Sequence, residues 1–223
     1  MFTQRNPDEI IAILLAFVIA TTIHEFMHAW TAWRLGDDTA ARMGRITFNP
    51  AMHFDPLGFI GMALIAIGFF AVGWGKPVPV NPNRFSLRGP RNQRIGMGIV
   101  AIAGPLSNVV QAAVVGVPYR IAVARGANFG GLEVYIFWFV LVNILLAGFN
   151  LIPIPPLDGS RILAAILPNF WYPFILQLER YGLAILLVLF FVGRFGDVSI
   201  LGSIYFPVVR ELSDLFLPGR FTG

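Results

Sequence analysis

The chain has 223 residues, of which 57% are apolar and only 13% are charged, whereas an average soluble domain carries roughly 25% charged residues. A soluble fold of this size would expose large apolar patches, so the composition excludes an ordinary soluble enzyme, a disordered chain and a nucleic-acid-binding domain. The net charge is +4. The chain has no cysteine, and this absence excludes disulfides, thiol nucleophiles and cysteine metal ligands.

The first predicted element is a long helix that begins near Asn6 and ends at Gly36. Asn is a preferred N-cap, Pro7 suits the first helical turn, and glycine commonly terminates helices. About 28 residues span roughly 42 Å, which exceeds the ~30 Å hydrocarbon core of a bilayer. We therefore expect a membrane helix. A cleavable signal peptide is disfavoured, because Arg5 is the only preceding basic residue and no small-residue cleavage site follows.

Further apolar blocks follow along the chain, and their lengths suit helices. The block 95–117 is rich in glycine, alanine and serine, which let membrane helices approach closely. The last block contains a proline and three charged residues, so it is either a sixth crossing or an interfacial helix. We expect an all-α polytopic membrane protein with about five or six membrane helices, in a single domain over 1–223. The blocks are 57–72, 95–117, 134–149, 174–192 and 200–217.

Two of the three histidines in the chain lie in the sequence H-E-x-x-H, at His24 and His28. On a helix, residues i and i+4 share a face, so both imidazoles can reach one metal ion. Glu25 points about 100° round the helix, where it can act on a metal-bound water without binding the metal. The alternative is a pair of interfacial histidines. It is disfavoured because an ionisable residue after an apolar span costs roughly 2.5 kcal/mol or more without a partner or a function.

A catalytic zinc site needs a third protein ligand, and the sequence offers two candidates. His53 is the remaining histidine. Asp158 follows the apolar block 134–149, in a segment whose three prolines end a helix and whose glycine allows a tight turn. Irregular backbone at membrane depth is tolerated only inside protein or beside a water-filled cavity. Asp158 is therefore favoured as the ligand, and a turn or helix cap is its alternative role.

These motifs resemble the site-2 protease family of intramembrane zinc metalloproteases, in its short prokaryotic form without a PDZ or CBS domain. The resemblance implies one Zn²⁺ per chain, bound by His24, His28 and Asp158. It also implies that Glu25 is the general base and that Asn150 binds a polar group of the substrate or the oxyanion. The matching stretches are H-E-x-x-H at 24–28, G-P-x-x-N at 104–108, N-x-x-P-x-x-P-L-D-G at 150–159, and two further stretches at 44–50 and 73–82.

The site also predicts the directions of the helices. If Asp158 completes the site, the first helix and the block 134–149 must run in the same direction, because each places its ligands near its C-terminal end. One of the two intervening blocks then does not cross. Basic residues flank the block 57–72 on both sides, and basic loops stay in the cytoplasm. We expect this block to enter and return, with the N-terminus outside and the active site toward the cytoplasm. A plain span with a basic outer loop is the alternative.

A substrate helix must be unwound locally before a peptide bond is attacked, and an extended peptide can pair with a strand edge. Two prolines make the segment 76–81 extended by composition, which predicts a short β element near 74–82. We expect this segment to bind substrate, and a plain surface loop is the alternative. The substrate-binding candidates are Pro77, Val78, Pro79 and Val80.

The sequence thus predicts an intramembrane zinc endopeptidase of the cell membrane, in which zinc and Glu25 activate water. Its partners would be the lipid bilayer and transmembrane protein substrates, with no nucleic acid; the oligomeric state stays open. A transporter for a divalent metal is the first alternative, because intramembrane histidine and aspartate also line ion paths. A catalytically inactive membrane scaffold is the second, which an intact Glu25 disfavours.

Overall fold

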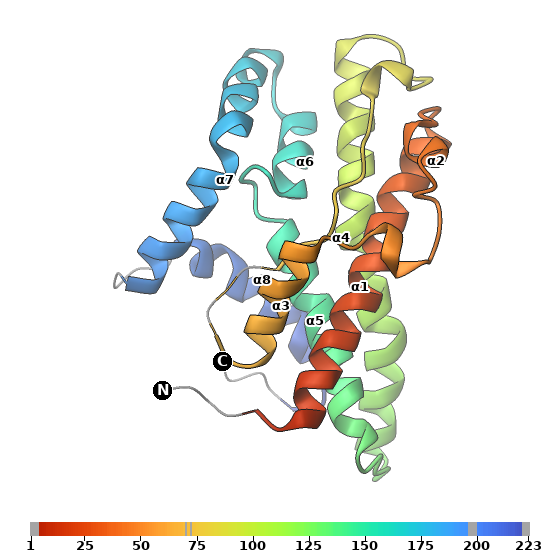
Figure 1. The fold of residues 1–223 in the computed structure, drawn as a ribbon, viewed down its shortest axis with the longest axis vertical. Coiled ribbons are helices and arrows are strands. Elements are labelled where there is room, and N and C mark those ends of the chain that lie inside the picture. The colour runs from red at the N-terminus through yellow and green to blue at the C-terminus, as the bar shows by residue number, and fades with distance from the viewer. Residues whose placement is uncertain (1–4, 70, 72, 196–199, 220–223) are drawn as a thin grey trace.

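The computed structural model describes residues 5–69, 71, 73–195 and 200–219, and every regular element in this part of the chain is a helix. Three helices, α1, α4 and α5, pack against one another at the centre, and α6 packs on α4 (Figure 1). The α-helices are α1 (Pro7–Arg34), α2 (Thr39–Arg42), α3 (Pro56–Ala66), α4 (Pro90–Ala124), α5 (Leu132–Asn150), α6 (Asp158–Ile166), α7 (Tyr172–Phe195) and α8 (Ile200–Phe216). Short 3₁₀ helices are η1 (Pro50–Met52), η2 (Pro82–Arg84) and η3 (Asn169–Trp171).

Among the described residues, three helices are long and apolar enough to cross a membrane, namely α1, α4 and α5. The expected count of five or six crossings is therefore not confirmed. The block 57–72 contains α3, whose 11 residues extend about 16 Å, too little for the ~30 Å hydrocarbon core. Residues 70 and 72 of that block lie outside the described part of the chain.

The helix α1 begins and ends where its capping residues predict. The Asn6 side chain accepts a hydrogen bond from the Glu9 amide at 2.8 Å, and Pro7 opens the first turn. At the other end, Gly36 adopts a φ of 105°, a conformation that glycine reaches without steric cost. The predicted first helix is confirmed.

The central helices have the directions that the sequence predicts. Figure 1 shows α1 and α5 running the same way, with α4 running opposite to both. Ala16, Phe17 and Ala20 of α1 form an apolar cluster with Val142 of α5, which holds these two helices side by side. Their C-terminal ends therefore lie toward the same end of the molecule.

The chain around α3 leaves the core and comes back to the same place. The Lys76 amide donates a hydrogen bond to the His53 carbonyl at 2.9 Å, so the segments before and after α3 are joined. A Cβ on Gly58 would lie 1.9 Å from the Trp74 carbonyl oxygen, so the returning chain packs directly on the first turns of α3. The far end of α3 lies beside Arg5, whose guanidinium donates to carbonyls of its last turn.

The expected β element near 74–82 is wrong for the described residues, where this segment is irregular until η2 begins. Two of its carbonyls, on Lys76 and Pro77, accept hydrogen bonds from the Arg45 guanidinium. Pro77 and Pro79 have no amide hydrogen to give to a ladder. The proline content predicted an extended backbone, but the carbonyls of this segment are bound by the buried Arg45 side chain and not by a neighbouring strand.

Candidate metal centre

Three side chains of the predicted site meet between α1 and the start of α6. His24 Nε2 and His28 Nε2 lie 3.0 Å apart, and each lies 3.2 Å from Asp158 Oδ2. All three side chains are buried. They form the one group of three or more histidine and acidic residues, within the described ranges, whose ligand atoms are close enough to share a metal ion.

The aspartate reaches the histidines because the chain turns tightly after α5. Asp158 is the first residue of α6, and Leu157 before it has an extended backbone. A Cβ on Gly159 would lie 2.4 Å from the carbonyl oxygens of both Leu151 and Ile152. The turn therefore closes against the end of α5 only because residue 159 has no side chain.

The space between these donor atoms fits zinc. Two ligands about 2.1 Å from one tetrahedral zinc ion lie roughly 3.4 Å apart, close to the separations of 3.0 and 3.2 Å found here. Gly104 of α4 keeps that space open, because a Cβ there would lie 2.4 Å from His28 Nε2 and 2.6 Å from His24 Nε2. Two imidazoles and one carboxylate are also a donor set that catalytic zinc sites use.

The outer nitrogens of both imidazoles have partners on α4. His24 Nδ1 lies 2.6 Å from Asn108 Oδ1, and His28 Nδ1 lies 2.7 Å from the Val100 carbonyl oxygen. Both partners are acceptors, so each Nδ1 carries the hydrogen and each Nε2 is left to bind a metal. The Asn108 amide nitrogen in turn donates to Asn143 Oδ1 at 2.8 Å.

Asn108 and Asn143 are residues whose roles the sequence did not reveal. Both are completely buried. Asn108 stands in the G-P-x-x-N stretch, so the motif marked it without saying what it contacts. Asn143 was visible only as a polar residue inside the apolar block 134–149. The structure shows that the pair connects α4 to α5 behind His24.

Glu25 lies beside the three-residue cluster but is not part of it. The residue is buried, with 9% of its surface exposed. No hydrogen bond to its carboxylate is found in the described chain. A Cβ on Gly75 would lie 3.4 Å from Glu25 Oε1, so the carboxylate faces the chain that returns from α3. Arg45 and His53 are close enough to interact with it electrostatically.

Asn150 and the segment 77–80, the other predicted site residues, make their hydrogen bonds and packing contacts elsewhere in the fold. Asn150 is the last residue of α5, and its amide nitrogen donates to the Leu146 carbonyl of the same helix at 2.9 Å. In the segment 77–80, the Pro77 carbonyl accepts from Arg45 at 3.1 Å. Val80 packs partly buried on the cluster around Phe85. No hydrogen bond or ion pair joins these residues to the three-residue cluster in the described part.

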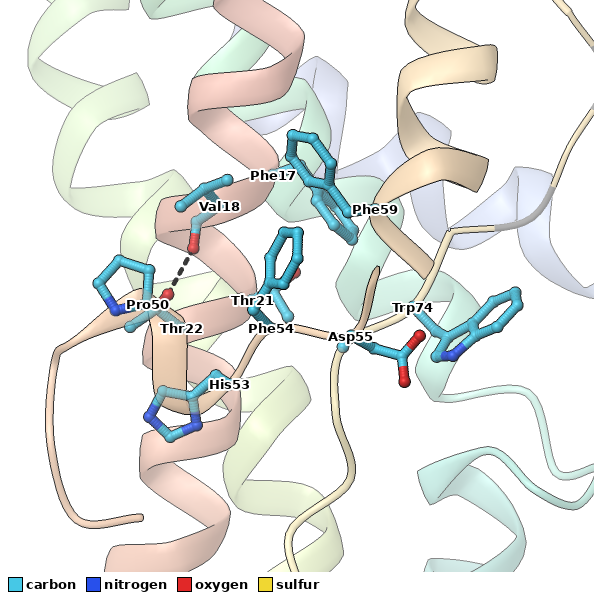
Figure 2. Close-up of a pocket in the computed structure, with 11 residues that line it drawn as sticks. Phe17, Val18, Thr21, Thr22, Pro50, His53, Phe54, Asp55, Phe59 and Trp74 are labelled. Atoms are coloured by element: carbon cyan, nitrogen blue, oxygen red, sulfur yellow. Dashed lines mark hydrogen bonds between the residues drawn. The ribbon is translucent and has the colours of Figure 1, made fainter. Parts of the chain in front are cut away.

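His53 is not brought to the metal-binding cluster. It is 2% exposed, and its Nε2 donates to the Thr47 carbonyl at 2.8 Å. Burial lowers the pKa of His53 below its ordinary value, so the ring is neutral near pH 7. Figure 2 shows it beside a small cavity that also borders Thr21 and Thr22 of α1, Asp55 and Trp74.

Comparison with known proteins gives one family and several relatives. Residues 112–192 match the model of "Peptidase family M50". The chain is 37% identical over 211 residues to "Putative zinc metalloprotease YwhC" of Bacillus subtilis, which covers 92% of this chain and 89% of that protein. It is 28% identical over 187 residues to "Putative zinc metalloprotease Rip2" of Mycolicibacterium smegmatis, covering 80% of this chain and 66% of that protein. No solved structure matches the chain significantly.

Proposed function

Since the chain belongs to peptidase family M50, the site-2 protease family of zinc metallopeptidases, we propose that it is an intramembrane endopeptidase. It would hydrolyse peptide bonds in or near the transmembrane segments of membrane proteins. The observation that carries this proposal is the buried cluster of His24, His28 and Asp158. Its two histidines lie on α1, which is one of the three helices that are long and apolar enough to cross a bilayer.

His24, His28 and Asp158 would hold one zinc ion. When bound, zinc supplies a Lewis acid that acts on the scissile carbonyl and on the attacking water. Asn108 and the Val100 carbonyl fix the imidazoles with Nε2 toward that ion. Gly104 leaves room for the ion against α4.

Glu25 would be the general base. It is one residue from His24, so its side chain leaves α1 about 100° away, which suits a group that acts on water and does not bind metal. Its carboxylate would accept a proton from the attacking water and then deliver that proton to the leaving amine. Asn150 would donate a hydrogen bond to a polar group of the substrate or to the developing oxyanion.

The unwound substrate would lie along the segment 77–80. The Pro77 carbonyl already accepts from Arg45, so the backbone of Val78, Pro79 and Val80 is what remains for pairing with an extended peptide. The proximity of Gly75 to Glu25 supports this placement, since it brings the start of the segment next to the base.

We place the N-terminus outside the cell and the metal site toward the cytoplasm. The short α3 and the hydrogen bond between Lys76 and His53 support a re-entrant segment, which enters the bilayer beside α1 and returns. Arginine and lysine stand on both sides of it, and such basic segments stay in the cytoplasm.

The test compares purified wild type with Glu25→Gln and Asp158→Ala, using a single-span membrane protein as substrate. We expect Glu25→Gln to keep zinc and to lose at least ~10²-fold in cleavage rate, because general base catalysis contributes about that much. Asp158→Ala should lose zinc as well as activity. Undiminished cleavage by Glu25→Gln would remove the catalytic proposal, and retained zinc in Asp158→Ala would remove the assigned ligand.

A further inference from the structure

The Glu25 carboxylate poses a structural problem. The residue as a whole is 9% exposed, and its carboxylate accepts no hydrogen bond within the described ranges. A buried carboxylate normally needs such partners, because burying an unpaired charge is costly. A general base must also keep a fixed orientation to be effective. A neighbouring group that fixes the orientation of the Glu25 carboxylate would therefore serve its proposed role as general base.

Three neighbouring side chains among the described residues have a buried polar atom without a hydrogen-bond partner, namely Arg45, Thr21 and His53. Arg45 already donates to the Lys76 and Pro77 carbonyls through its Nη2, which leaves Thr21 and His53. Thr21 Oγ1 and His53 Nδ1 are both buried and have no hydrogen-bond partner among the described residues. The neighbouring Thr22 differs, because its hydroxyl donates to the Val18 carbonyl at 2.6 Å. His53 donates through Nε2 to the Thr47 carbonyl, so Nδ1 of the neutral ring is a hydrogen-bond acceptor.

Thr21 and His53 border the same cavity, which lies between α1 and the chain on either side of α3 (Figure 2). Its volume is about 20 Å³, enough for one water molecule, which needs roughly 10–15 Å³ and two to four polar partners. In Figure 2 the His53 ring lies further along α1 than Thr21 and Thr22, on the side away from Phe17.

Gly75 connects this cavity to the base. It lines the cavity, and a Cβ added to it would lie 2.5 Å from Thr21 Cγ2 and 3.4 Å from Glu25 Oε1. Thr21, Glu25 and the wall of the cavity therefore converge on one glycine. Thr21 and His53 line the cavity together with Gly75, and Glu25, which is not a lining residue, lies next to Gly75.

We propose that Thr21 and His53 are positioning residues that hold the Glu25 carboxylate through one buried water. The water accepts a hydrogen bond from the Thr21 hydroxyl and donates one hydrogen to His53 Nδ1 and the other to Glu25. All three polar groups are then satisfied, with each donor matched to an acceptor. This inference rests on the proposed role of Glu25 as general base.

The hydroxyl is tested with a matched pair of variants on adjacent residues. Thr21→Val and Thr22→Val remove the same group from neighbouring buried positions, but only Thr21 has an unpartnered hydroxyl. We expect Thr21→Val to lower kcat about tenfold with KM and zinc content unchanged, since small misplacements of a catalytic group cost up to ~10²-fold. Thr22→Val should keep wild-type kcat. Equal kcat values for the two variants would overturn the proposal.

The imidazole is tested with two substitutions that each keep one of its hydrogen bonds. His53→Gln retains a donor that reaches the Thr47 carbonyl but has no acceptor at the Nδ1 position. His53→Asn retains an acceptor near Nδ1 but does not reach Thr47. We expect His53→Asn to keep the higher kcat. If His53 only anchors the loop, the order reverses, and that order would refute the positioning role.

A crystal structure of the full chain gives a readout that does not depend on activity. An ordered water within hydrogen-bond distance of Thr21 Oγ1 and His53 Nδ1 is expected in the wild type and should be lost in Thr21→Val. A wild-type map without that water would refute the proposal. If Glu25 is not the general base at all, the Glu25→Gln variant itself cleaves substrate normally, so this outcome is distinguished from a failure of the positioning proposal.

Discussion

Gly104 determines whether two imidazoles and a carboxylate can share an ion. It lies in the middle of α4, where glycine weakens a helix by about 1 kcal/mol relative to alanine. Glycine lets the α4 backbone lie close to the two imidazoles, because any side chain at position 104 would overlap His24 Nε2 and His28 Nε2. The helix thus contains a locally unfavourable residue at a point where its backbone passes directly beside the proposed metal ligands.

We therefore expect Gly104→Ala to fold normally and to lose zinc. Loss of an outer hydrogen-bond partner of a ligand costs ~10–100-fold in metal affinity, and direct overlap with two ligands should cost at least as much. Zinc content after dialysis against a chelator measures the effect. Gly131→Ala is the control, because a Cβ there meets nothing within 4 Å. Full zinc content in Gly104→Ala would contradict the assigned position of the ion.

The three proposed metal ligands could be predicted from the sequence. His24 and His28 follow from i, i+4 spacing, and the proline-rich context of Asp158 marked it as unusual. The structure places all three together. The contacts of Asn108 and Asn143 could not be predicted, because they connect α1, α4 and α5 and depend on how these helices rotate against each other.

Between α1 and α4 the chain is held by side chains and not by a sheet. Arg45 is 2% exposed, and it binds the Lys76 and Pro77 carbonyls. Asp37 is completely buried and accepts a hydrogen bond from the Asn81 amide at 2.6 Å. These two contacts fasten the proposed substrate-binding segment at both ends.

Arg45→Lys should loosen the first of these ends. Lysine keeps the charge, but its compact ammonium does not reproduce the planar fork of arginine. We expect the Lys76 amide to exchange its hydrogen about tenfold faster, since a hydrogen bond to a charged group contributes ~1.5–3 kcal/mol. The Asn81 amide, held by Asp37, should change less. Arg42→Lys, at an exposed ion pair with Asp38, is the control. Unchanged exchange at Lys76 would show that Arg45 does not fasten the segment.

The elements themselves were largely predictable, and their exceptions have physical causes. Capping residues predicted α1, and apolar length predicted α4 and α5. The β element near 74–82 was not found, because strand composition does not provide a partner strand. The interpretation of the block 57–72 as a re-entrant segment stays a prediction, since the short α3 excludes a full helical crossing without showing a bilayer.

For the whole molecule, the parallel directions of α1 and α5 follow from shared ligands, and the structure has the same arrangement (Figure 1). Length and charge predict the orientation of the helices in the membrane. Two exposed asparagines mark the ends of α4, Asn83 before it and Asn128 after it.

The absence of cysteine makes this orientation directly measurable. In intact cells, a membrane-impermeant maleimide should label Asn128→Cys and leave Asn83→Cys unlabelled until the membrane is opened, because the basic end of α4 is expected in the cytoplasm. The unsubstituted chain, which has no cysteine to label, is the negative control. The opposite pattern would invert the orientation, and labelling of both from one side would mean that α4 does not cross.

The wide spacing of the metal-binding residues has a consequence for biosynthesis. A ribosome that has completed His28 must add about 130 further residues before Asp158 exists, which takes roughly 7 to 26 s at ~5–20 residues per second. During that interval α1 is already available for insertion, but its histidines have no carboxylate partner. A nascent or prematurely terminated chain would therefore have an incomplete metal site, and the peptidase would become competent only after Asp158 has joined the two histidines of α1.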